Sequence, residues 1–227
     1  KATRMITQLF EENVPKIYVA DGHHRTSAGA LAGQEFVQAR KGTLDDGKPD
    51  NYFLAVLFPD NQLDILDYNR VVKDLNGLSS AEFLLLVERD FVVEKKSGHF
   101  RPDALHTFGM YLDGNWYKLI ARSGTYNGNP IGQLDVNILT NKVLEPILGI
   151  VDLRTDQRID FVGGIRGLGE LERRVDSGEM KVAFALYPVS MQKIIEIADA
   201  GHIMPPKVTW FEPKLGSGLF VYSLEDA

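Results

Sequence analysis

Apolar and polar positions alternate along the chain in a way that predicts short strands followed by helices. Apolar runs bounded by turn residues are typical of strands, and they occur at 17–20, 51–58, 63–66, 91–94, 107–112, 116–121, 158–162 and 181–186. Apolar residues at helical spacing predict helices over 26–40, 79–89, 136–148, 168–175 and 190–200. This order of elements indicates an α/β fold class, with helices packed on a mixed sheet.

Local signals strengthen several of these elements. The residues 113–115, Asp-Gly-Asn, predict a tight hairpin between the strands on either side. Ser79 with Glu82 three residues later is typical of a capping box. Asp135 is predicted to cap the next helix, and Pro146 should disturb the last turn of that helix.

Turn residues predict further boundaries. Asp-Asn at 60–61 is expected to join 51–58 and 63–66 as a hairpin, and Gly201 should close the last helix at its C′ position. The aromatic tail 208–222 is expected to form a hairpin around 216–218. The segment 124–132 is rich in Gly and Asn, and it suggests a boundary between a domain over 1–123 and a second α/β subdomain over 133–227.

Composition narrows the classes of protein that fit. The chain has 227 residues, a formal net charge of -6 and no cluster of Lys and Arg, which argues against nucleic-acid binding. The absence of Cys excludes disulfides and thiolate chemistry and fits a reducing compartment. No apolar run reaches the roughly 18 to 20 residues needed to cross a bilayer. We therefore expect a cytoplasmic protein that binds neither nucleic acid nor membrane, and the composition leaves a homo-oligomer open.

The residues with the clearest chemistry follow the first predicted strand, at Asp21, Gly22, His23, His24 and Arg25. Gly22 allows a sharp turn, and the next residues should lie at a helix N-terminus, where free N–H groups favour an anion. Arg25 can bind phosphate oxygens through two donors, while the two imidazoles add further donors. Asp21 can bind a metal ion, orient a histidine or accept a proton. The alternative is an ordinary Asp-Gly turn with a solvated histidine pair.

Cationic side chains occur at four other places: Arg70, Lys207, Lys214 and, within the glycine-rich segment 163–169, Arg166. Arg70 is a candidate second phosphate clamp, or else an exposed residue of a loop. Lys207 and Lys214 follow prolines in what we expect to be rigid, extended backbone, and each lysine either reaches the same anion as Arg25 or is solvated. The glycine-rich segment 163–169 is expected to be a tight connection rather than an anion-binding nest.

These motifs resemble those of a bacterial family known only as a domain of unknown function, number 1015. After the Ala-Asp-Gly-His-His-Arg run, the resemblance continues through 68–72, 134–136, 144–150, 204–207, 209–215 and 218–219. Members of that family are longer at the N-terminus, so we expect this chain to be an N-terminally truncated, C-terminal part. The turn alone is also similar to the phosphate-binding motif of the ParB/sulfiredoxin-like superfamily, which includes ADP-dependent free-serine kinases.

The superfamily resemblance implies a ParB/sulfiredoxin-like N-terminal part in which Gly22, His23, His24 and Arg25 hold nucleotide phosphates. Together with the residues, it indicates a nucleotide-dependent phosphotransferase that uses ADP or ATP with Mg²⁺ and acts on a small metabolite such as serine. Asp21 would hold the metal. The serine kinases also use a glutamate base from a segment upstream of the motif, and neither Glu11 nor Glu12 maps onto it. A nucleotide sensor without catalysis and an interaction protein are the alternatives.

Overall fold

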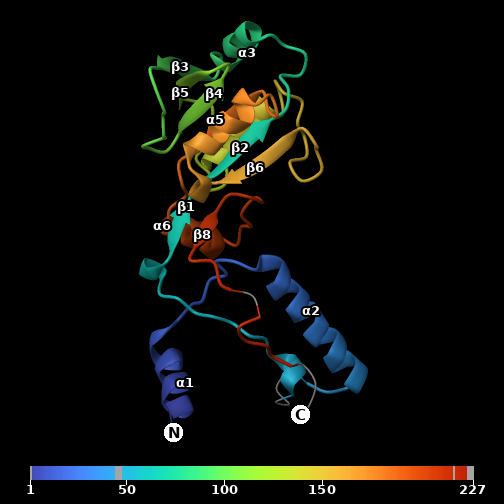
Figure 1. Cartoon of the computed structure of the whole chain (residues 1–227). Helices are drawn as coiled ribbons and strands as arrows, with labels where there is room; N and C mark the ends of the chain where they lie inside the picture. The colour runs from blue at the N-terminus through green and yellow to red at the C-terminus, as the bar shows by residue number, and fades with distance from the viewer. Residues whose placement is uncertain (1, 44–47, 217, 224–227) are drawn as a thin grey trace. The chain divides into compact units, whose positions relative to one another are not determined.

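The structure is a computed structural model, and it describes residues 2–43, 48–216 and 218–223. The chain divides into two compact units (Figure 1). The large unit is Asp64–Glu212, and the small unit combines Lys1–Leu63 with Pro213–Ala227.

An antiparallel sheet forms the centre of the large unit. Within the described residues it has six strands in the order β3-β5-β4-β7-β2-β6, and each neighbouring pair is antiparallel. The strands are β2 Tyr68–Val72, β3 Phe91–Lys96, β4 Thr107–Leu112, β5 Asn115–Ala121, β6 Ile159–Gly163 and β7 Val182–Ala185. The chain thus contains both helices and β-sheet, which confirms the predicted α/β class.

Helix α5 (Leu168–Asp176) connects β6 to β7 and packs on the sheet, as Figure 1 shows. Since β6 and β7 both pair antiparallel with β2, they run parallel to each other with β2 between them. This is a split β-α-β arrangement. Leu171 of α5 is fully buried in a cluster that includes Val71, Tyr111 and Trp116 from the sheet. The predicted helix 168–175 is therefore confirmed.

The hairpin predicted around 113–115 is present between β4 and β5. Asp113 and Gly114 both have positive φ, 48° and 72°, which is the requirement of a type I′ turn. Leu112 pairs with Asn115 directly across this turn. Local turn chemistry therefore determined the register of this hairpin.

Two helices begin and end as their caps predict. Ser79 and Glu82 exchange both bonds of a capping box at the start of α3 (Ser80–Val87). Helix α6 (Met191–Asp199) begins after Ser190, whose hydroxyl accepts from the N–H of Lys193. Gly201, at φ 70°, follows α6, and the N–H groups of Gly201 and His202 donate to Ala198 and Ile197. This is a Schellman motif, as expected for a C′ glycine.

The helix predicted over 136–148 is only partly α-helical. It begins as α4 (Asp135–Leu139), continues as a π-helical turn over Thr140–Leu144 and then becomes a series of turns. Pro146 lacks an N–H and interferes with the preceding turn, which explains the change. The predicted cap was wrong, because Leu134 is the N-cap and Asp135 already lies inside the helix. The Asp135 carboxylate accepts instead from the backbone N–H of His106.

Strand β1 (Asp64–Leu66) pairs with β8 (Trp210–Glu212) rather than with residues 51–58. The hairpin predicted around 60–61 was therefore wrong, and a 3₁₀ turn, Asp60–Gln62, lies there. The tail hairpin predicted around 216–218 includes Ser217, which lies outside the described residues; β8 takes β1 as its partner. The error at 60–61 concerns which segment pairs with which, and pairing depends on contacts that are distant in sequence.

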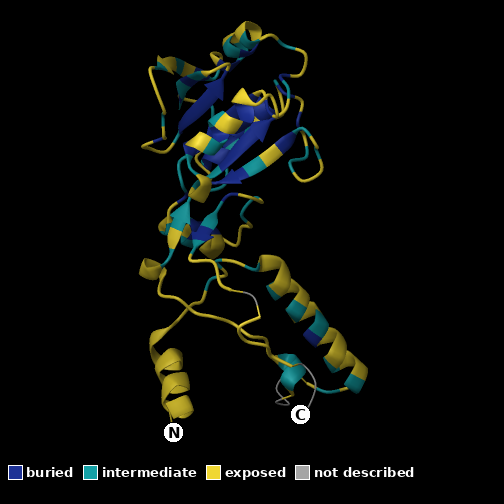
Figure 2. Cartoon of the chain, viewed as in Figure 1, coloured by how far each residue is buried: buried dark blue, intermediate teal, exposed yellow. Residues whose placement is uncertain are grey.

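The small unit contains helices α1 (Ala2–Asn13) and α2 (His23–Arg40) and a 3₁₀ turn at Pro49–Asn51. The predicted helix 26–40 is confirmed and begins three residues earlier, at His23. The strands predicted at 17–20 and 51–58 were wrong, because no sheet ladder includes these segments within the described residues. Apolar residues such as Ile17 and Phe53 are exposed there, and Figure 2 shows the segments mostly in yellow.

Helix α2 packs against the 3₁₀ turn through a close backbone approach. Gly33 is the buried residue of α2, and an added Cβ there would lie 3.1 Å from the carbonyl oxygen of Asp50. Arg40 forms an ion pair with Asp50 and donates to Asn51 Oδ1 at 3.0 Å. These contacts hold the C-terminal half of α2, while its N-terminal turn faces solvent.

The Gly- and Asn-rich segment 124–132 lies inside the large unit, and the six-stranded sheet contains strands that precede this segment and strands that follow it. Across the part of the chain that the structure describes, no helix is both long and apolar enough to cross a membrane.

Candidate functional site

The Asp21–Arg25 turn lies in the small unit, where Gly22 forms the N-cap of α2. Gly22 has φ 82° and ψ 26°, a left-handed conformation that strains any residue with a Cβ. The carboxylate Oδ1 of Asp21 accepts from the N–H of Gly22 at 2.7 Å. The first helical hydrogen bond runs from Thr26 N–H to the Gly22 carbonyl at 2.9 Å. This geometry directs the chain abruptly into the helix.

The N-terminus of α2 is open to an external anion. It has no side-chain cap, and its first turn contains no acidic residue. The N–H groups of His23, His24 and Arg25 belong to the first turn, which leaves such donors without helical partners. All three side chains are exposed. The amides, together with the positive end of the helix dipole, favour a bound anion there.

Two cationic side chains flank this helix end. The guanidinium of Arg25 lies beside Gly22, because a Cβ added at Gly22 would lie 3.1 Å from Arg25 Nη2 and 3.3 Å from Nε. Lys214 comes from the C-terminal segment of the same unit, and its Nζ donates to Asp21 Oδ2 at 2.8 Å. The structure therefore brings Asp21, Arg25 and Lys214 to one turn.

Asp21 is held in its ionised form. The hydrogen bond from Lys214 is the main influence that lowers the pKa of the Asp21 carboxyl, and the bond from Gly22 N–H and the charge of Arg25 act in the same direction. A carboxylate with a lowered pKa is a weak proton acceptor. Its negative charge is well suited to binding a cation or to positioning Lys214.

Arg70 belongs to the large unit and lies inside strand β2, where it is 1% exposed. Its Nη2 donates to the carbonyl of Lys207 at 2.8 Å, and its Nη1 donates to the carbonyl of Tyr68. The guanidinium also lies 5.4 Å from the ring centre of Phe161, and burial lowers the pKa of Arg70 to about 9. An exposed loop position, the alternative considered for Arg70, was wrong. The Nε of Arg70 is buried and has no hydrogen-bond partner among the described residues.

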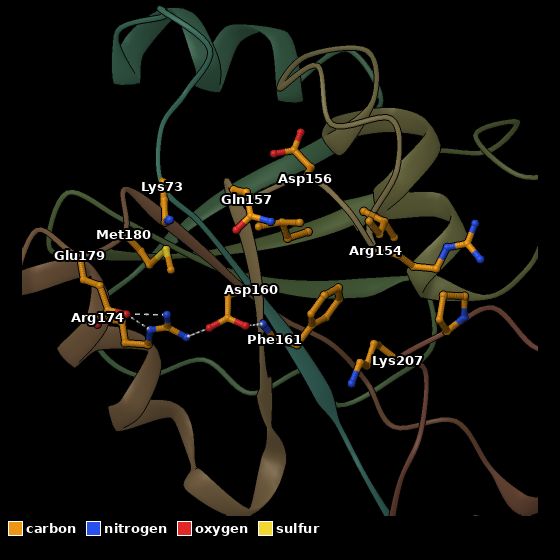
Figure 3. Close-up of a pocket in the computed structure, with 13 residues that line it drawn as sticks. Lys73, Arg154, Asp156, Gln157, Asp160, Phe161, Arg174, Glu179, Met180 and Lys207 are labelled. Carbon is orange, nitrogen blue, oxygen red and sulfur yellow. Dashed lines mark hydrogen bonds and ion pairs between the residues drawn. The ribbon is translucent and has the colours of Figure 1, made fainter. Parts of the chain in front are cut away.

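Lys207 adopts a turn instead of the extended backbone that its prolines suggested. Its φ is 58°, in the left-handed region, and its Nζ lies 5.6 Å from the ring centre of Tyr68. Lys207 lines a cavity of about 560 Å³ in the large unit, shown in Figure 3. Lys207 and Lys214 therefore lie in different units.

Opposite charges line the cavity of Figure 3. Arg174 is 9% exposed and bridges two acids, with Nη1 at 2.7 Å from Asp160 Oδ2 and Nε at 2.9 Å from Glu179 Oε1. Lys73 and Lys207 also line the cavity. No short motif in the sequence indicates this group, because its members come from separate segments of the chain. The amphipathic pattern of 168–175 predicted the helix without indicating that Arg174 would be buried.

The glycine-rich segment 163–169 is a tight connection, as expected. The N–H of Gly164 donates to the carbonyl of Asp67 at 2.7 Å. A Cβ at Gly164 would lie 2.5 Å from Asp67 Oδ1, and one at Gly163 would lie 2.6 Å from the Trp210 ring. Glycine is required by this close packing.

The chain matches the family described as "Protein of unknown function (DUF1015)" over residues 1–137. The chain belongs to the DUF1015 family. The matched region includes the Asp21–Arg25 turn and the strands β2 to β5. No curated protein matches the chain.

Solved structures with some similarity to this DUF1015 chain include a conserved hypothetical protein from Pyrococcus furiosus. That protein is 12% identical, with 92% of this chain and 81% of that chain covered and a TM-score of 0.46. A free serine kinase in complex with AMP is 12% identical, with 92% and 78% covered and a TM-score of 0.42. A variant of a free serine kinase in complex with ADP is 15% identical, with the same coverage and a TM-score of 0.41.

Among the described residues, no cluster of three or more His, Cys, Asp or Glu side chains is arranged to hold a metal ion. Asp21 is the residue of the α2 turn for which the sequence predicts binding of a metal ion. Mg²⁺ commonly takes only one or two carboxylates and completes its shell with phosphate oxygens and water. Asp21 alone does not form a metal cage, and its two oxygens already accept from the Gly22 N–H and from Lys214 Nζ.

Proposed function

We propose that this DUF1015 protein is a nucleotide-dependent phosphotransferase that binds the phosphates of ADP or ATP at the N-terminus of α2 and acts on a small metabolite. The observation that carries the proposal is the uncapped first turn of α2, with the Arg25 guanidinium folded beside Gly22. Backbone amides, a helix dipole and a guanidinium at one point favour a phosphate. The resemblance of the turn to the ParB/sulfiredoxin-like motif supports the same assignment.

Each residue of the turn has a role in this proposal. Gly22 permits close approach of the phosphate, and Arg25 stabilises negative charge on the transferred group. His23 and His24, both exposed at the helix end, donate to phosphate oxygens. Lys214 pairs with Asp21 at 2.8 Å, and this pairing holds its ammonium group at the same turn. The phosphate-binding role predicted for Arg70 and Lys207, which belong to the large unit, is not part of the site proposed at α2.

Mg²⁺ is the metal that this chemistry would use, and Asp21 is the residue that would hold it. When bound, the ion would neutralise charge on the phosphates. The acceptor is proposed to be a small polar metabolite with a hydroxyl group, for which the amino acid serine is the first candidate from the motif resemblance. The hydroxyl oxygen would form the new bond to phosphorus while the bond to the nucleotide oxygen breaks.

A nucleotide sensor without turnover is the second candidate, and the state of Asp21 favours it. The hydrogen bond from Lys214 lowers the pKa of the Asp21 carboxyl, so this group is a weak base for removing a proton from the acceptor. A site that binds phosphate without an effective base would shift a conformational or partner equilibrium instead.

The proposal is tested by calorimetric titration of the protein with ADP and with ATP, each in the presence of Mg²⁺. Arg25→Ala should weaken nucleotide binding at least tenfold, because a charge-assisted hydrogen bond is worth about 1.5 to 3 kcal/mol. Arg4→Ala is a matched control, since Arg4 is an exposed residue of helix α1 and the substitution removes the same charge from the same unit. This control should bind nucleotide as the unmodified chain does.

The outcomes separate the candidates. Phosphorylated serine formed from ATP or ADP supports the phosphotransferase, whereas binding without turnover supports the sensor. If the unmodified chain binds neither nucleotide, or if Arg25→Ala binds as tightly as Arg4→Ala, the α2 turn is not the phosphate site and both candidates fail.

A further inference from the structure

A second, smaller cavity of about 250 Å³ lies in the large unit, between the start of β4 and the start of α6. Its charged and polar lining includes His106, Gln133, Asp135, Lys193 and Glu196. Its apolar lining comes from Leu105, Leu134, Pro188 and Val189. The cavity therefore has a lining that is partly apolar and partly polar.

Asp135 is the unusual residue of this cavity. It is 4% exposed, and its Oδ1 accepts from the backbone N–H of His106 at 2.9 Å. Its Oδ2 is buried and has no hydrogen-bond partner in the structure. A buried acceptor without a donor costs about 1 to 3 kcal/mol, and more when it is charged. The site therefore lacks one donor.

Two donors of the cavity lining, Lys193 Nζ and the His106 ring, have partners other than Asp135. Lys193 Nζ lies 3.5 Å from Gln133 Oε1 and 3.4 Å from Glu196 Oε2. The ring of His106 has its Nε2 at 3.2 Å from the Gln133 carbonyl oxygen, and the ring stacks on Tyr126 at a centroid distance of 3.9 Å. Asp135 Oδ2 therefore has no donor among the described residues.

We propose that this cavity binds a small primary amine, whose ammonium group donates to Asp135 Oδ2 while its carbon chain lies against the apolar lining. An ammonium group brings both the missing donor and the opposite charge that a buried carboxylate needs. The volume suits a molecule of a few heavy atoms. This site is independent of the phosphate site proposed at α2, because the large unit supplies its whole lining.

The ionisation of Asp135 makes the binding sensitive to pH. Burial raises the pKa of this carboxyl to about 7 in the free protein. Other titratable groups face the cavity: His106, whose pKa burial lowers, and Tyr187, Lys193 and Glu196. An alkylamine stays protonated over this range, so the fraction of ionised Asp135 governs its affinity. That fraction rises about tenfold from pH 6 to pH 8 for a pKa of 7.

The probe for the test is n-butylamine, titrated calorimetrically into the full chain at pH 6 and pH 8. We expect binding at pH 8 that weakens about tenfold at pH 6. Neither n-butanol nor butyrate, which match the amine in size, should bind. Asp135→Asn keeps an oxygen for the His106 N–H but loses the charge, so it should abolish both the binding and its pH dependence.

Glu88→Gln, at an exposed carboxylate of the large unit that does not line this cavity, is the matched control, and it should preserve the tenfold pH ratio. If Asp135→Asn fails to fold, the pH ratio and the butanol and butyrate controls in the unmodified chain still test the proposal. Equal binding of butylamine and butanol, no binding of butylamine at pH 8, or competition by potassium chloride as strong as by the amine would each overturn the proposal.

Discussion

Asp135→Asn also tests how burial of this carboxyl affects folding when no ligand is present. The unfolded chain has an aspartate with a pKa of 3.8, whereas burial raises the pKa of Asp135 to about 7 in the folded state. Between these two values the folded protein binds a proton that the unfolded chain has lost. The contribution of Asp135 to stability is therefore fully present below pH 3.8 and is lost as the pH rises to 7.

The magnitude follows from the two pKa values. Each pKa unit corresponds to about 1.4 kcal/mol, so the full loss is about 4 kcal/mol, of which about 2 to 3 kcal/mol falls between pH 5 and pH 8. Asparagine does not titrate and can still accept from His106 N–H through Oδ1. The free energy of unfolding of the variant should therefore rise relative to that of the unmodified chain by about 2 to 3 kcal/mol over this pH range.

Urea unfolding followed by tryptophan fluorescence measures this difference. Both tryptophans of the chain, Trp116 and Trp210, lie in the large unit that contains Asp135, so the signal reports on that unit. Equal m-values for the two proteins at each pH would show that the denatured states are comparable. If the variant and the unmodified chain differ by the same amount at pH 5 and pH 8, burial does not perturb Asp135 and the reasoning is wrong.

Two further substitutions test the packing of the large unit. Ser79→Ala removes the hydroxyl that accepts from the Glu82 N–H and should lower the free energy of unfolding by about 1 kcal/mol, while Ser79→Asn should restore most of the loss. Gly109→Ala places a Cβ 2.7 Å from the carbonyl oxygen of Phe100 and should cost about 1 to 3 kcal/mol. Gly98→Ala, where an added Cβ meets nothing within 4 Å, should change stability little, and equal effects of the two glycine substitutions would contradict the packing argument.

The α2 turn shows how far local sequence can predict a site. The Asp-Gly step and the helical spacing after it were enough to place Gly22 at the helix N-terminus, where its φ is 82°. They did not indicate that Asp21 would be held by Lys214, which lies far away in the sequence. Arg70 likewise reads as an exposed cation, and only the packing of β2 against Phe161 and the 205–208 turn made it a buried one.

The sequence by itself determined the elements whose signals act within a few residues. The type I′ hairpin at Asp113-Gly114 and the capping box at Ser79 are examples, because their geometry depends on backbone conformations and hydrogen bonds between near neighbours. Only the tertiary structure decided which strands pair, as for β1 with β8, and which charges are buried, as for Asp135 and Arg174. Pairing and burial depend on segments far apart in the chain, so a strand-like run such as 51–58 carries no local sign of whether a partner will be there.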